Sequence, residues 1–152
     1  MSDSLDAYLV LSGILFAIGA GTQVEAVDDN STYPPEAPQT KLSALQPNAE
    51  AVAGYAPDLV VVTNDANGLV ASLDKLKIPT LVLPAAKTLD EAYAQMITLG
   101  KATGHEDDAQ KVVTTTKDRV ATAVASVPAA AKGKKVYHEL DPTFYSVTGE
   151  TF

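Results

Sequence analysis

Two continuous apolar runs with a short helical pattern between them constrain the fold of this chain more than any other feature. The run PDLVVVT (57–63) is rich in β-branched residues, and IPTLVLP (78–84) has the same apolar character. Unbroken runs of this kind are typical of strands that are covered on both faces of a parallel sheet. Between them, LVASLDKL (69–76) has apolar residues at a helical spacing. The order strand, helix, strand predicts a right-handed βαβ unit and an α/β fold.

Two longer helices are predicted after this unit. The first begins with Thr88 as N-cap and Glu91 three residues later, which is a capping box, and ends at Gly100 or Gly104. The second covers 106–127 and has acidic residues in its first turn, where the helix dipole favours them. At 1.5 Å per residue this helix would be about 30 Å long, the width of a small domain. It is long for a helix that only completes a crossover between strands.

The segments before the βαβ unit and after the long helix have simpler patterns. QVEAVDD (23–29) alternates apolar and polar residues, which predicts a short strand. NSTYPPEAP (30–38) contains two adjacent prolines and is predicted to be an ordered loop. A short helix follows, with Asn48 as N-cap or Pro47 at its first position. KVYHEL (135–140) is predicted to start a new strand.

The most apolar stretch, AYLVLSGILFAIGAG (7–21), allows several interpretations. It is interrupted by Ser12 and Gly13, whereas a membrane-spanning helix needs about 20 predominantly apolar residues. The preceding MSDSLD has no Lys or Arg, so no signal peptide is recognised. We predict the buried opening of an α/β domain, with an interfacial helix as the alternative. Two conformations stay open for Leu9–Ser12, an edge strand beside Gln23–Val27 or a continuation of the helix.

Composition restricts the function classes. The chain has 152 residues, the size of one domain, and a formal net charge of −8. Such a charge argues against nucleic acid or an anionic membrane as partner, because both attract basic patches. The absence of cysteine excludes disulfides, thiolate catalysis and cysteine-ligated metal centres.

Catalytic motifs are not evident. His105 and His138 lie in different segments, and neither belongs to a metal-binding or nucleophile motif. No glycine-rich phosphate loop follows a strand. His105 is predicted to be a surface residue, whereas His138, beside Glu139 and Asp141, is open to a ligand or metal role as well as a structural one. The chain is therefore predicted not to be an enzyme, and no metal site is predicted.

Loops at strand ends are the better candidates for binding, because ligands of open α/β sheets bind beyond the carboxyl ends of the strands. Tyr33 is an aromatic residue in a proline-fixed loop and could present a flat apolar face, although local packing explains it equally well. Thr63, Asn64 and Asp65 are polar groups at a strand end, and they too could simply form a turn. Glu50 lies in the first turn of a helix, where the dipole alone accounts for a carboxylate.

Four segments, taken in their order along the chain, together resemble a known family. The quoted stretches are ILFAIGAGTQVEAVDD, STYPPEAPQTKLSALQPNAEAVAGYAPDLVVVTND, LDKLKIPTLVLP and VYHELDPTFYSVTGETF. Together they resemble the substrate-binding proteins of ABC importers for vitamin B12 and iron-siderophore chelates, the class with a long helical backbone between two lobes. The resemblance implies a three-layer α/β/α N-terminal lobe with a mainly parallel sheet (1–105), a backbone helix (106–127) and the start of a truncated second lobe (128–152).

The resemblance also implies roles for particular residues. Tyr33 falls where B12-binding members place a ring against the corrinoid, and Thr63 falls where some members have a large aromatic residue. Glu50 falls on the carboxylate that pairs with arginines of the permease. The segment from His138 to Tyr145 matches the first strand of the second lobe and its ligand-facing turn. The implied ligand-binding set is Ser31, Thr32, Tyr33, Thr63, Asn64, Asp65, His138 and Tyr145.

Two departures from the family pattern are visible. Members usually have Ser-Pro-x-x-Thr-Glu between the first strand and the first helix, and here LVLS runs directly into GILFAIGAG. About half of the family length is absent, and a lone lobe would expose the apolar stripe of its long helix. If the chain is complete, we expect it to form a homodimer, by exchange of the tail after Ala129, or to be marginally stable.

Three functions follow from these observations. The leading one is a periplasmic or extracytoplasmic, membrane-associated binding protein that delivers cobalamin, a ferric siderophore or haem to an ABC transporter permease. No separate cofactor is predicted. The alternative is a ligand-free α/β interaction or oligomerising module derived from such a protein. A small enzyme of flavodoxin-like shape is the third and is disfavoured, because no nucleophile and base are paired.

Overall fold

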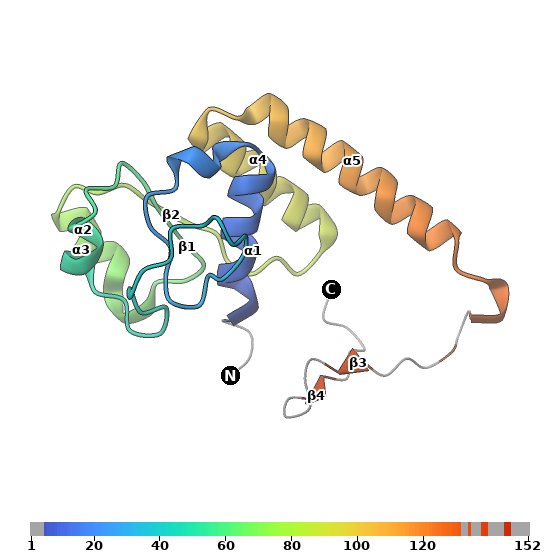
Figure 1. The fold of residues 1–152 in the computed structure, drawn as a ribbon, viewed down its shortest axis with the longest axis horizontal. Coiled ribbons are helices and arrows are strands. Elements are labelled where there is room, and N and C mark those ends of the chain that lie inside the picture. The colour runs from blue at the N-terminus through green and yellow to red at the C-terminus, as the bar shows by residue number, and fades with distance from the viewer. Residues whose placement is uncertain (1–4, 132–133, 135–137, 140–144, 147–152) are drawn as a thin grey trace.

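The computed structural model describes residues 5–131, 134, 138–139 and 145–146. In chain order its elements are α1 (Leu5–Ala17), η1 (Ala20–Gln23), α2 (Ala49–Ala53), β1 (Val60–Val62), η2 (Ala66–Gly68), α3 (Leu69–Lys75), β2 (Thr80–Val82), α4 (Leu89–Thr103), α5 (Glu106–Ala125), η3 (Ala129–Ala131), β3 (His138–Glu139) and β4 (Tyr145–Ser146). The helices α1 to α4 surround β1 and β2, and α5 extends from this body (Figure 1).

The βαβ unit predicted from the two apolar runs is confirmed. β1 and β2 pair in parallel, with Val61 opposite Leu81, and α3 connects them. Because side chains alternate along a strand, the two faces of this small sheet are covered by different helices. Val61 and Leu81 pack against the buried residues of α1, α4 and α5, whereas Val60 and Val62 pack with the buried residues of α3. The expected α/β/α layering is therefore present.

The main core lies between α1, α4 and the start of α5. Its members are buried apolar side chains that come together from distant parts of the sequence: Leu11, Ile14, Ile18, Ala20, Leu83, Leu99 and Ala109. Ile18 and Leu99 are fully buried. A second contact joins α5 to α4, because Lys117 Nζ lies 4.9 Å from the ring centroid of Tyr93.

The predicted helix ends are largely confirmed. The predicted N-cap is confirmed, because Thr88 Oγ1 accepts a hydrogen bond from the Glu91 amide. The Glu91 carboxylate accepts its bond from the Lys87 amide, one residue before the cap, and not from the Thr88 amide as in a regular capping box. Of the two predicted starts of α2, the one with Asn48 as N-cap is confirmed, because its side chain accepts from the Ala51 amide and the helix begins at Ala49. The helix that begins after Thr88 continues to Thr103 and is capped by Gly104.

The strand predicted over 23–29 is wrong. Gln23 ends η1, and Val27 forms only an isolated parallel bridge with Gln39. The reason is that Asp28 bonds the loop that follows it, as its carboxylate accepts from the amides of Asn30 and Ser31. These local bonds turn the chain away before a ladder can extend.

The open question about Leu9–Ser12 is resolved in favour of the helix, because α1 is continuous from Leu5 to Ala17. Within the strand predicted over 135–140, His138–Glu139 forms β3, and the remaining positions lie outside the described residues. β3 pairs antiparallel with β4. Among the described helices, none is both long and apolar enough to cross a bilayer.

Candidate functional site

The loop that carries Tyr33 is held to α1 by specific bonds. Asp28 Oδ1 accepts hydrogen bonds from the amides of Asn30 and Ser31, both at 2.9 Å, which forms an Asx turn. Ser31 is buried by this turn. Further along, Ser12 Oγ donates to the Tyr33 carbonyl oxygen at 2.7 Å. The proline-rich loop is therefore anchored immediately before its two prolines.

The Tyr33 side chain packs on α1 at one side and is otherwise exposed to solvent. Its exposed fraction is 63%. The ring lies beside Gly13 of α1, since a Cβ placed there would be 3.6 Å from Tyr33 Cδ1. Local packing and ring presentation, the two interpretations of this residue, are thus both compatible with the structure. An aromatic ring that rests on a helix and faces solvent loses little entropy on binding.

The polar residues after β1 mainly form a turn. Thr63 is buried, and its hydroxyl accepts a hydrogen bond of 3.4 Å from the exposed Asn64 side chain. Asp65 Oδ1 accepts from the Val70 amide at 2.9 Å, which supports the start of α3. The hydroxyl of Thr63, the side-chain amide of Asn64 and the carboxylate of Asp65 are therefore all engaged within the turn.

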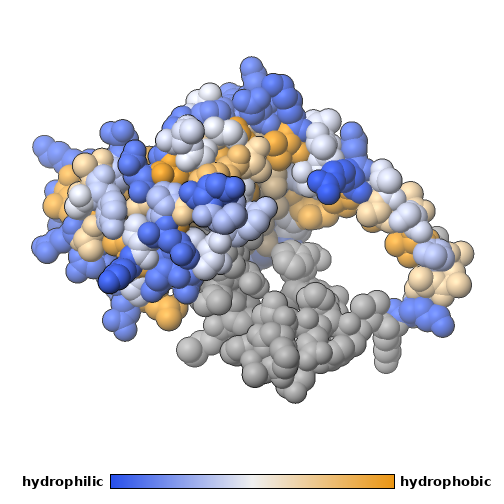
Figure 2. Space-filling view, in the orientation of Figure 1, coloured by the Kyte–Doolittle hydropathy of each residue, from blue (hydrophilic) through white to orange (hydrophobic). Residues whose placement is uncertain are grey.

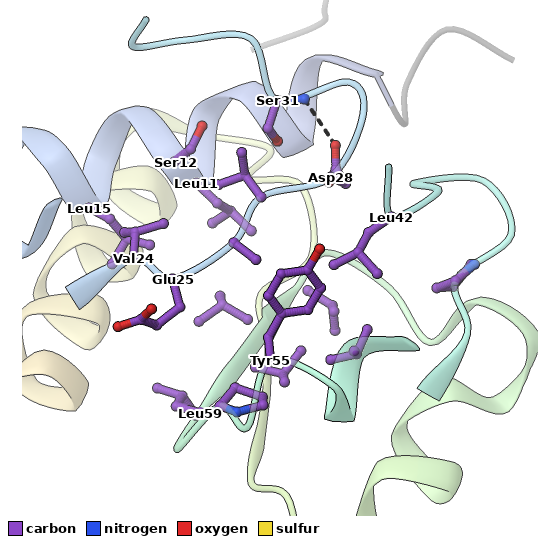
Figure 3. A pocket seen from close by; sticks show the side chains of 18 of the residues that line it. Leu11, Ser12, Leu15, Val24, Glu25, Asp28, Ser31, Leu42, Tyr55 and Leu59 are labelled. Atoms are coloured by element: carbon purple, nitrogen blue, oxygen red, sulfur yellow. Dashed lines mark hydrogen bonds between the residues drawn. The ribbon is translucent and has the colours of Figure 1, made fainter. Parts of the chain in front are cut away.

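A cavity of about 910 Å³ lies between α1, the segment 24–28 and β1. Figure 3 shows side chains that line it from several elements: Leu11, Ser12, Leu15, Val24, Glu25, Asp28, Ser31, Leu42, Tyr55 and Leu59. Half of this set is apolar, and its polar groups are the hydroxyls of Ser12 and Ser31, the carboxylates of Glu25 and Asp28 and the phenol of Tyr55.

The cavity joins only part of the predicted site. Ser31 and Asn64 both line it. Thr32, Tyr33 and Thr63 do not line it, and Asp65 lines a separate cavity of about 550 Å³ beside Asp74 and Lys77. His138 and Tyr145 lie in β3 and β4, where they are paired with Ser146 and Glu139.

Sequence reasoning missed Tyr55 and Glu25. Tyr55 follows the short helix α2, is 44% exposed and lines the cavity wall opposite Glu25 (Figure 3). Neither residue belongs to a recognisable motif, because they meet only through the fold. The apolar signal at Leu59 was visible, but it predicted a strand and not a cavity wall.

Glu50 stands apart from the cavity. It lies in the first turn of α2, is exposed and is engaged in no ion pair among the described residues. Asn48 caps the same turn through the Ala51 amide at 2.9 Å. A carboxylate presented in this way is available to a basic partner.

Two groups at the start of α5 have shifted pKa values. The pKa of Asp108 is lowered by a hydrogen bond from Lys111 and by its positive charge, and the pKa of Lys111 is raised by the same pair. Within the described part of the chain, no three or more His, Asp or Glu side chains gather as a metal would require.

Comparison with known proteins shows the family. Residues 9–151 match the model of the periplasmic binding protein family, so the chain belongs to that family. It is a family of substrate-binding proteins for transport, which confirms the expectation that the chain is not an enzyme.

Particular relatives carry the same signal. The chain is 29% identical to an uncharacterised ABC transporter substrate-binding lipoprotein of Bacillus subtilis, with 91% of this chain and 47% of that protein covered. It is 33% identical to a cobalamin-binding protein of Halobacterium salinarum, with 83% and 36% covered. A solved structure from Staphylococcus epidermidis, described as a possible iron-binding, periplasmic solute-binding protein, matches with a TM-score of 0.74 and 25% identity over 88% of this chain and 54% of that one. The chain thus spans about half or less of the length of these relatives.

Proposed function

We propose that the chain provides the N-terminal ligand-binding lobe of an extracytoplasmic substrate-binding protein, which takes up a metal chelate and delivers it to an ABC transporter permease. In this proposal 1–105 is the lobe, 106–127 is the backbone helix and 128–152 begins a second lobe. Family membership and the two relatives named for cobalamin binding and ABC transport support the class.

The exposed ring of Tyr33 is the observation that best supports a metal chelate as the ligand. Corrinoids and porphyrins present broad flat faces, and an aromatic ring packs well against such a face. Tyr33 is more exposed than the other described tyrosines, Tyr55 and Tyr93, and the Ser12 hydroxyl holds its backbone in place. Cobalamin, a ferric siderophore and haem are the candidate ligands.

Titration tests this assignment. Purified protein is mixed with cyanocobalamin, ferrichrome or haemin, and the visible spectrum of the ligand and tyrosine fluorescence are followed. We expect one of the three to bind at micromolar concentration, and Tyr33→Ala to weaken that binding.

Tyr55→Ala is the matched aromatic control, because Tyr55 is also exposed but lines the cavity instead of the proline loop. If Tyr55→Ala weakens binding and Tyr33→Ala does not, the chelate binds in the cavity and the assignment to Tyr33 is wrong. If no ligand binds at all, the ligand-free interaction module replaces the proposal.

Glu50 is proposed as the residue that docks on the permease. Its exposure and its lack of an ion pair among the described residues support this role, and opposite charges steer such encounters. In a complete importer that carries this lobe, Glu50→Ala should leave chelate binding unchanged and reduce transport. Asp90→Ala is the control, since Asp90 is likewise an exposed acid in the first turn of a helix, α4. Equal loss in both variants would exclude a specific docking role.

A further inference from the structure

Asn67 and Gly68 form an exposed turn between β1 and α3. Both residues belong to η2, a single 3-10 turn, and both are exposed. Asn67 has a φ of 56° and Gly68 a φ of 69°, so two consecutive residues are in the left-handed region. Asparagine and glycine are the residues that adopt this conformation at the least cost. The turn therefore favours this pair, in which an asparagine side chain directly precedes a glycine amide.

An asparagine before a glycine can react with its own backbone. The Gly68 nitrogen attacks Asn67 Cγ, the bond from Cγ to the side-chain nitrogen breaks, and that nitrogen leaves as ammonia with the proton of the Gly68 amide. Water then opens the succinimide ring that has formed. Attack of water on the Asn67 backbone carbonyl leaves an isoaspartyl residue, whereas attack on Cγ leaves aspartate. No enzyme or cofactor is needed, because both reacting groups are neighbours in one chain.

The structure leaves room for this attack at Gly68. Apart from its two neighbours in the chain, nothing lies within 4 Å of the place that a Cβ would occupy. Among the described residues, no hydrogen bond engages the Asn67 side chain. Because η2 is one exposed turn, its backbone opens at little cost, and glycine then rotates more freely than any other residue.

The other three asparagines are less open to this reaction. Asn30 precedes a serine, and the Ser31 amide is occupied because it donates to Asp28 Oδ1 at 2.9 Å. Ser31 is also buried, with an exposed fraction of 3%. The side chains of Asn48 and Asn64 are each engaged in a hydrogen bond, one in the cap of α2 and the other in the turn after β1. The fold therefore favours the reaction at Asn67.

We propose that Asn67 is a site of spontaneous covalent modification, at which loss of ammonia to the Gly68 nitrogen converts the turn into an isoaspartyl linkage. In this linkage the main chain runs through Cβ and Cγ, so the backbone becomes longer by a carbon and the former backbone carbonyl becomes a free carboxylate. The class of reaction is deamidation followed by hydrolysis, and water is the only co-reactant. The site is independent of which ligand the protein binds.

The modification acts on the start of α3. Asp65 Oδ1 accepts a hydrogen bond from the Val70 amide at 2.9 Å, and this bond spans Asn67 and Gly68. A longer main chain between its two ends changes the spacing that the bond requires. Leu69 follows the pair directly and is buried against β1 and α2, so it moves with the turn. The isoaspartyl form should therefore be less stable than the asparagine form.

Mass spectrometry on the full chain tests the site. Purified protein is incubated in mildly alkaline buffer, either folded or in urea, and its peptides are then quantified. Replacement of the amide by a carboxylate raises the mass of the peptide, and an isoaspartate methyltransferase with S-adenosylmethionine labels the isoaspartyl form. In the folded chain we expect Asn67 to convert at least about tenfold faster than Asn30, because a misplacement of about 1 Å can slow a positioned reaction about 100-fold.

Urea separates the effect of the fold from that of the sequence. It releases the Ser31 amide, so the difference in rate between Asn67 and Asn30 should become smaller in urea. Two results would overturn the proposal. One is an Asn67 that converts in urea but stays unmodified in the folded chain, and the other is an Asn30 that converts as fast as Asn67 in the folded chain.

Asn67→Gly is the matched variant. Glycine adopts a φ of 56° without strain and has no side-chain amide to lose. The variant should keep its midpoint of thermal unfolding during the incubation, whereas the midpoint of the unmodified protein should fall as isoaspartate accumulates. A fall of equal size in Asn67→Gly would contradict the link between this modification and the start of α3.

Discussion

Gly100 and Gly104 look equivalent in the sequence, where either could end the fourth helix. In the structure Gly104 has a φ of 75° and caps α4, which is the left-handed conformation that glycine adopts without strain. Gly100 is a buried helical residue at the contact with α5, and a Cβ there would lie 2.5 Å from Ala109 Cβ. One glycine is needed for its backbone and the other for its missing side chain.

This difference predicts the effect of Gly100→Ala. Alanine favours a helix over glycine by about 1 kcal/mol, so a gain in stability would be expected from propensity alone. The added carbon would also lie 2.9 Å from the His105 carbonyl oxygen, and crowding of this kind costs about 1–3 kcal/mol. We expect the free energy of unfolding, measured by urea denaturation, to fall.

Ala109→Gly provides the partner for a double-mutant cycle. It removes the carbon that the new Cβ would meet, so Gly100→Ala should be less harmful in its presence. Strictly additive losses would show that the clash with the Ala109 side chain is not the cause.

At the scale of elements, α5 divides into a packed part and an exposed part. Ala109 and Val113 are buried, whereas the residues from Ala121 to the end of the helix are exposed. Figure 2 shows hydrophobic surface along this helix, and Val124 is 67% exposed. The buried contacts of α5 with the core are therefore made by the first half of the helix.

Val113→Ala and Val124→Ala test this division with the same chemical change on the same helix. At 4% exposure, Val113 loses buried methyl groups, and we expect a loss of about 1–3 kcal/mol in the free energy of unfolding. Val124→Ala should change it by less than about 0.5 kcal/mol, as is usual for surface positions. Equal losses would mean that the distal half of α5 is packed in solution.

The first turns of α5 contain a pH-sensitive pair. Asp108 accepts a hydrogen bond of 2.8 Å from Lys111, and this bond, with the attraction between the charges, lowers the pKa of Asp108. A carboxyl group with a lowered folded pKa stabilises the fold above its unfolded pKa, and the benefit disappears as pH falls through the folded value. The stabilisation should therefore be lost in acid, below about pH 4.

The matching shift of Lys111 acts at the other end of the scale. Its raised pKa stabilises the fold below the unfolded value, and this benefit is lost as pH rises through the folded one. In a plot of stability against pH, we expect Asp108→Asn to make both the acid and the alkaline decline slightly less steep. The effect is small because the pair is exposed. The midpoint of thermal unfolding, measured from pH 2 to pH 12, tests this expectation. Acid and alkaline declines that are the same in the variant would exclude the pair as their source.

How far the sequence predicts these elements depends on whether the signal is local. The Thr88 and Asn48 caps were predictable, because each depends on neighbours within a few residues. The βαβ unit was predictable because its strand, helix and strand follow one another directly and each has its own apolar pattern. The strand over 23–29 was predicted wrongly. Its alternation is genuine, but pairing requires a distant partner, and Asp28 bonds the next turn instead.

The candidate site shows the same limit at the scale of the whole molecule. Tyr33 could be singled out because two prolines follow it. The cavity could not be predicted, because its walls come from α1, the segment 24–28, Tyr55 and β1, which are distant in sequence. Leu11 and Ser12 of α1 also line it, in a conformation that apolar composition alone left undecided.

Net charge is a property of the whole chain and predicts how salt acts on it. Nineteen acidic residues face eleven basic ones, and a charge of −8 repels itself more strongly in the compact state than in the unfolded one. Raising NaCl from about 10 mM to about 150 mM shortens the screening length from about 30 Å to about 8 Å. We expect the midpoint of thermal unfolding to rise over this range.

A charge variant separates screening from other effects of salt. Glu36→Lys with Asp74→Lys changes two exposed positions, and because each replaces −1 by +1, the net charge moves from −8 to −4. If self-repulsion limits stability, this variant should have the higher midpoint at low salt and the smaller rise with added NaCl. A midpoint that falls with salt in the unmodified protein would instead show that attractive pairs, such as Lys101 with Glu106, outweigh the net charge.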